Sequence, residues 1–114
     1  MRVVPLIVLS LVVAATPAIA AERTGYSQIA AGNMGAAERS IVAERRIFPD
    51  RPELMLNLAA VYRNTGRAAE AKALYAAVLD KPAVALDMPS GAVVSSHDLA
   101  QRGLARFAPQ MATR

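Results

Sequence analysis

The stretch over residues 52–82 constrains this chain most, because its apolar residues recur with a helical period on both sides of a glycine. In the first half they stand three and four residues apart, at Leu54, Met55, Leu58, Ala59 and Tyr62. In the second half the same spacing gives Ala71, Leu74, Tyr75, Val78 and Leu79. Gly66 lies between the halves and suits the positive φ that ends a helix. The pattern predicts two one-sided helices packed as a hairpin.

The order of large and small residues in this hairpin resembles the tetratricopeptide repeat, a helix–turn–helix unit of about 34 residues. The residues that carry the resemblance are Met55, Leu58, Ala59, Tyr62, Gly66, Ala71 and Tyr75. Leu58 and Tyr62 are expected to fill the groove between the helices, and the small Ala59 and Ala71 to lie where the helices cross closest. The segment departs from the repeat where methionine replaces the usual tryptophan and where the closing proline comes about one residue early.

A degenerate copy of the pattern precedes the first at a spacing of 34 residues. The matched pairs are Gly25 with Ala59, Gly32 with Gly66, Ala37 with Ala71, and Ile41 with Tyr75. The resemblance therefore implies two tetratricopeptide-like hairpins over residues 21–82, the first with helices at about residues 22–31 and 35–47. Asp50 and Glu53 are predicted to form a capping box for a helix that starts at about Arg51.

The first twenty residues read as a secretory signal peptide. Arg2 precedes an apolar run over residues 3–15, and the small residues Ala18 and Ala20 form a cleavage site. We expect cleavage after Ala20 and export to the periplasm, in a signal style typical of bacteria. The alternative is an uncleaved membrane anchor over residues 3–20, although Pro17 interrupts a run that is short for a membrane span.

The part after the hairpins predicts an ordered loop or a short hairpin over residues 83–95, in which Val84, Leu86, Val93 and Val94 could pair. Ser95 or Ser96 is then expected to cap a last helix over residues 96–108, followed by a tail over residues 109–114. This helix would cover the outer face of the second hairpin, because the terminal unit of a repeat stack needs a cap. The predicted fold is all-α, with antiparallel hairpins of a short tetratricopeptide-like solenoid and a C-terminal capping helix.

The composition limits the chemistry that we expect. The chain has no cysteine, so disulfides and thiol chemistry are excluded. Its net charge of +4 favours acidic partners only weakly. One histidine and scattered carboxylates lack metal-ligand spacing, and no phosphate-binding or nucleophile motif occurs. We therefore expect no catalytic residues, no cofactor, no metal and no nucleic-acid partner.

One short run contains the residue types of a catalytic triad. Ser95, Ser96, His97 and Asp98 follow one another in the sequence. Adjacent residues point in different directions, so they cannot converge on one proton path. A serine is expected to cap the helix, Asp98 to suit its first turn, and His97 to lie in solvent.

The resemblance implies a binding groove, because the first helix of each hairpin lines a concave surface in tetratricopeptide proteins. The partner-binding positions would be Tyr26, Ile29, Glu53, Leu56, Ala60, Arg63 and Asn64. Some relatives clamp a peptide's terminal carboxylate with asparagines on these faces; Leu56 and Ala60 stand at such places, so that clamp is not expected. Burial of Leu56 and Tyr26 against a neighbouring helix or a second subunit is the alternative.

The function implied is a non-enzymatic protein–protein interaction module, a small adaptor or assembly subunit of the cell envelope. It would bury a protein or peptide segment in a pre-formed groove, with Arg63 and Glu53 setting its orientation by charge. Two alternatives remain open. One is a self-associating structural protein that forms a homodimer through its exposed helical face, and the other is an accessory subunit of an envelope enzyme.

Overall fold

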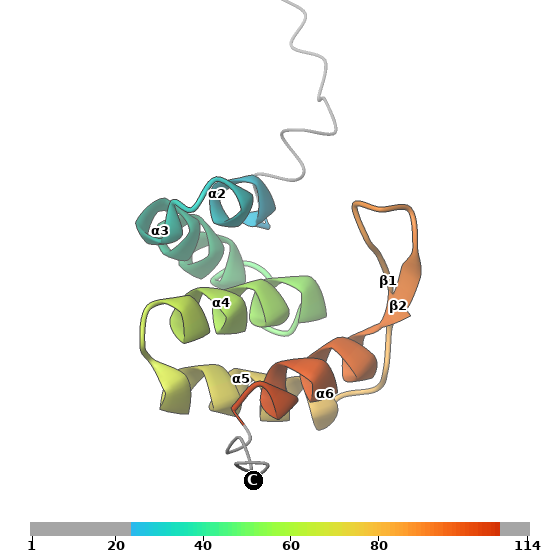
Figure 1. Cartoon of the computed structure of the whole chain (residues 1–114). Helices are drawn as coiled ribbons and strands as arrows, with labels where there is room; N and C mark the ends of the chain where they lie inside the picture. Colours follow the sequence, from blue (N-terminus) through green and yellow to red (C-terminus); the bar gives the residue numbers. More distant parts are fainter. Residues whose placement is uncertain (1–23, 108–114) are drawn as a thin grey trace, which may run out of the picture.

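The computed structural model describes residues 24–107, which are mostly helical (Figure 1). The elements follow the order α2 (Tyr26–Ala30), α3 (Met34–Arg45), α4 (Pro52–Asn64), α5 (Ala68–Leu79), β1 (Ala85–Asp87), β2 (Val93–Ser95) and α6 (Ser96–Ala105). The predicted predominance of helix is confirmed. The predicted signal peptide, its cleavage site and the tail over residues 109–114 lie outside the described residues.

The helices repeat along the chain with a period of 34 residues. Helix α3 spans Met34–Arg45 and α5 spans Ala68–Leu79, so both ends of α5 lie 34 positions after those of α3. The turn that precedes each of them contains a glycine in the left-handed region, Gly32 with φ 79° and Gly66 with φ 78°. The helices before these turns also end 34 residues apart, α2 at Ala30 and α4 at Asn64.

The helix starts differ from the predicted ones at two places. Helix α2 begins at Tyr26, after the left-handed Gly25, and not near residue 22. Helix α4 begins at Pro52 with Arg51 at its N-cap, and no side chain caps it. The predicted capping box is therefore wrong, because Asp50 lies one position too early to accept from the first turn. Its carboxylate instead accepts from the Lys81 ammonium, at 2.9 Å.

The core consists of two apolar clusters on opposite sides of α4. One cluster joins α3 to α4 through Ala37, Ile41, Leu54, Leu58 and Val61. The other joins α4 to α5, β1 and α6 through Met55, Leu56, Ala59, Ala71, Tyr75, Val78, Leu86 and Ala100. Ala59 and Ala71 lie fully buried in this second cluster, as predicted. Leu58 was predicted to fill the groove between α4 and α5, but it packs in the cluster shared with α3.

Helix α6 lies against both α4 and α5 and approaches α5 very closely (Figure 1). A Cβ atom built on Gly103 would lie 2.3 Å from Cζ of Tyr75, so only glycine fits here without movement. On the same side of α6, Ala100 is fully buried, and Leu99, Leu104 and Phe107 pack half-buried against the core. The predicted cap over residues 96–108 therefore does cover α5, and the observed helix ends at Ala105.

The stretch over residues 83–95, left open as a loop or a hairpin, forms a two-stranded antiparallel hairpin. Leu86 pairs with Val94 at the centre of its register, and the Leu86 side chain is buried in the core. The fully buried Ser96 fixes the base of the hairpin, because its Oγ accepts from the Val84 N–H at 2.9 Å. Two strands alone are marginal in water, and this anchoring to α6 explains why they persist.

Candidate functional site: a cleft between α4, α6 and the hairpin

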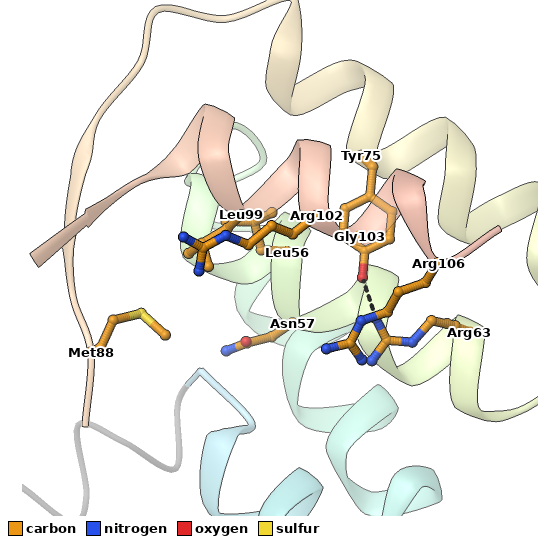
Figure 2. Close-up of a pocket in the computed structure, with 9 residues that line it drawn as sticks. All are labelled: Leu56, Asn57, Arg63, Tyr75, Met88, Leu99, Arg102, Gly103 and Arg106. Carbon is orange, nitrogen blue, oxygen red and sulfur yellow. Dashed lines mark hydrogen bonds between the residues drawn. The ribbon is translucent and has the colours of Figure 1, made fainter. Parts of the chain in front are cut away.

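A cleft of about 260 Å³ opens between α4, α6 and the tip of the β hairpin (Figure 2). Its lining residues come from four parts of the chain and are Leu56, Asn57, Arg63, Tyr75, Met88, Leu99, Arg102, Gly103 and Arg106. The volume lies below the roughly 300–1,000 Å³ typical of pockets for drug-sized ligands. A cleft of this size and partly apolar lining suits one or two residues of an extended partner segment.

Two of the seven predicted partner-binding residues line this cleft. Leu56 borders it from α4 but is only 9% exposed, because most of its side chain belongs to the core. The alternative of burial against a neighbouring helix therefore holds for Leu56. Arg63, one helical stretch further along α4, presents its guanidinium to the cleft (Figure 2).

The other five predicted residues lie outside the lining of the cleft. Tyr26 is 43% exposed, and Ile29 packs half-buried against the cluster between α3 and α4. Glu53 and Ala60 are half-buried on α4, and Asn64 is exposed at the end of that helix. The structure therefore does not unite the first and second copies in one groove, but pairs α4 with α6.

The sequence analysis missed Asn57 and all of the residues from α6. Asn57 follows Leu56 directly and donates its side-chain N–H to the backbone carbonyl of Thr24 at 2.9 Å. Arg102 and Arg106 stand four residues apart on α6, so they share one face of that helix. This spacing was visible in the sequence, but α6 was interpreted only as a cap.

The three arginines of the cleft differ in their charge partners. Arg102 donates to the Asp98 carboxylate at 2.9 Å, one turn away on α6. Neither Arg63 nor Arg106 forms an ion pair with any residue between 24 and 107. Arg63 donates from Nη1 to the Tyr75 hydroxyl oxygen at 3.3 Å, the hydrogen bond drawn in Figure 2.

The Tyr75 phenol lies at the cationic end of the cleft. Burial raises its pKa above the ordinary tyrosine value, and the charges of Arg63 and Arg106 oppose that rise. The phenol therefore keeps its proton at neutral pH. Because both guanidinium groups act on the same hydroxyl and both line the cleft, they bring two uncompensated positive charges to one place.

A third ion pair lies outside the cleft and joins the two repeats. Arg67, in the turn before α5, donates two hydrogen bonds of 2.7 Å each to the two carboxylate oxygens of Glu38 on α3. This bidentate contact lowers the pKa of Glu38 below its ordinary value. The guanidinium of Arg67 also lies 4.3 Å from the centre of the Tyr62 ring.

The serine–histidine–aspartate run makes four separate local contacts. Ser95 Oγ accepts from the backbone N–H of His97, and Asp98 accepts from Arg102. Ser96 Oγ is occupied by the hairpin, and a His97 ring nitrogen pairs with the backbone carbonyl of Lys81. His97 is therefore half-buried and was wrongly expected in solvent. These side chains do not converge, and they hold the hairpin and α6 together.

Comparison with known proteins adds no relative to this description, since no family model, no curated protein and no solved structure matches the chain. Among the described residues, no helix is both long enough and apolar enough to cross a membrane. Within the same part of the chain, no three histidine, cysteine, aspartate or glutamate residues are grouped so that they could hold a metal ion.

Proposed function

We propose that the protein is a non-enzymatic protein–protein interaction module, which holds a short segment of a partner protein in the cleft between α4 and α6. The observation that carries the proposal is the lining of the cleft. Apolar groups from Leu56, Met88 and Leu99 lie next to arginines from two different helices. Such a mixture of apolar contact and positioned polar groups is typical of sites that bind peptides or small ligands.

The 34-residue period of the helices supports the proposal that the module is a short tetratricopeptide-like solenoid. Equal bounds of α3 and α5, together with equal turn glycines, are what successive copies of one helical unit produce. In such a solenoid the ten-residue α6 takes the place of the next unit's first helix, and the β hairpin is an insertion before it. A cleft between α4 and α6 then lies where first helices of neighbouring units meet.

The proposed place of action is the cell envelope, and its basis is the signal-peptide pattern of residues 1–20. The partner is a protein or peptide of that compartment. Export without cysteine means that packing alone keeps the domain folded there, and the two apolar clusters on α4 provide this packing.

Site-specific photocrosslinking in intact cells tests the proposal. A photoreactive residue at Met88, on the hairpin side of the cleft, would report on what enters it. Ile47, which is 67% exposed and does not line the cleft, is the matched position for background crosslinks. We expect one partner that crosslinks at Met88 and not at Ile47. The purified partner should bind the wild-type protein, bind Arg102→Glu more weakly, and bind the exposed control variant Arg46→Glu unchanged.

Self-association is the second candidate, because several large apolar side chains are exposed. Ile47, Phe48 and Val93 are 67%, 41% and 64% exposed and lie on three separate parts of the described chain from the cleft lining. Light scattering coupled to size-exclusion chromatography separates the two candidates. A dimer whose crosslinks at Met88 reach only other copies of the chain would replace the adaptor proposal, and a monomer would remove this second candidate.

A further inference from the structure

We propose that the cationic end of the cleft, formed by Arg63, Arg106 and the Tyr75 hydroxyl, binds a carboxylate of the partner segment next to an aliphatic side chain. This inference rests on the proposed function and specifies the chemistry of the bound segment. It concerns one end of the cleft, which Figure 2 shows at the Tyr75 hydroxyl.

The cationic end offers hydrogen-bond donors and has no acceptor of its own for them. The Tyr75 oxygen accepts from Arg63, which leaves the phenolic proton to donate elsewhere, and no residue between 24 and 107 accepts it. Arg106 makes no hydrogen bond or ion pair within the described residues, and Arg63 has no carboxylate partner there. Three donors that carry two positive charges and face one cleft are suited to an oxyanion.

The favoured oxyanion is a carboxylate because of what adjoins the donors. The cleft continues from Tyr75 to the apolar groups of Leu56, Leu99 and Met88 (Figure 2). An aliphatic residue that bears a carboxylate, or that adjoins an acidic residue, would fill both parts at once. The Asp98 carboxylate already pairs with Arg102, so it does not compensate the two free arginines.

The resemblance did not predict this site. The positions from which some tetratricopeptide relatives clamp a terminal carboxylate were expected to hold Leu56 and Ala60 here. The donors found in the structure instead come from the end of α4, the middle of α5 and the end of α6. Only the packing of α6 across the hairpin of α4 and α5 brings them together.

The side-chain Nε–Hε signals of the arginines, observed by NMR in the ¹⁵N-labelled purified protein, test the inference. The probe is the dipeptide acid acetyl-alanyl-leucine, and its C-terminal amide is the matched control. We expect saturable shifts of the Arg63 and Arg106 signals with the acid and not of the exposed Arg46. The amide should bind about tenfold more weakly or worse, because hydrogen bonds to a charged group are lost. Arg106→Gln should lose about the same factor, and Arg46→Gln nothing.

Two further probes identify the source of the anion. If acetyl-aspartyl-leucinamide binds like the dipeptide acid, an internal acidic residue satisfies the site; if it does not, the site requires a chain end. Equal binding of the acid and its amide would overturn the inference. Tighter binding of inorganic phosphate than of the acid would also overturn it, in favour of a phosphate group.

The two proposals can fail separately. If the acid does not bind while the partner still crosslinks at Met88 in the Arg106→Gln variant, the carboxylate site falls and the interaction module stands. If the acid binds as expected but no partner crosslinks at Met88, the interaction module falls and the anion site stands. The melting temperature of each variant is measured alongside, so that unfolding is not mistaken for lost binding.

Discussion

The close approach of α6 to α5 gives the sharpest prediction, which concerns Gly103→Ala. A Cβ atom at this position would lie 2.3, 2.4 and 2.7 Å from three carbons of the Tyr75 ring. Non-bonded carbons prefer about 3.5–4.0 Å, so the helix or the ring must move by more than about 1 Å. The ring cannot move freely, because Tyr75 is 3% exposed and bonded to Arg63.

The expected magnitude follows from two opposing effects. Overpacking of a close-packed core costs about 1–3 kcal/mol. Alanine in place of glycine in a helix recovers up to about 1 kcal/mol. We therefore expect a net loss of about 1–2 kcal/mol in the free energy of unfolding. For a domain of this size, that loss lowers the melting temperature by about 5–15 °C.

Thermal unfolding followed by circular dichroism measures this effect, and Gly35→Ala is its matched control. A Cβ at Gly35 on α3 would meet only Arg39 Nη1, at an ordinary 3.6 Å. The control should therefore leave the stability unchanged or raise it by up to about 1 kcal/mol. In a Tyr75→Leu background, which removes the ring, the cost of Gly103→Ala should shrink. A Gly103→Ala protein as stable as wild type would refute the placement of α6 on Tyr75.

Three other substitutions test the remaining contacts. Ala71→Leu should cost about 1–3 kcal/mol, because Ala71 is fully buried where α4 and α5 pack; an unchanged melting temperature would contradict this packing. Glu38→Gln should lower the melting temperature at pH 7. Because Arg67 lowers the folded-state pKa of Glu38, its contribution exists above the ordinary carboxyl range, and the difference from wild type should vanish as the pH falls from about 5 towards 3; a constant difference would argue against the ion pair. Ser96→Ala should cost about 1 kcal/mol and speed hydrogen exchange of the Val84 amide, and a protected amide would show that another group holds the hairpin.

The sequence by itself determined the helices of the two repeats. Their apolar period and the glycines at positions 32 and 66 act locally, because each turn of helix places neighbours three and four residues apart on one face. The predicted burial of Ala59, Ala71, Tyr75 and Val78 is therefore confirmed. The capping box failed for the same local reason, since a shift of one residue puts Asp50 outside the cap.

Only the tertiary structure decided where the cleft lies. The sequence patterns on α4, α5 and α6 identify an apolar side for each helix but not the angle at which the helices meet. That angle depends on a non-local contact, the Gly103 backbone against the Tyr75 ring. The same packing places Arg106 of α6 near Arg63 of α4, more than forty residues apart in the sequence, as the opposing effects of both charges on the Tyr75 hydroxyl show. The helices were thus readable from local periodicity, and the candidate binding site was not, because its residues meet only when α6 packs across the hairpin.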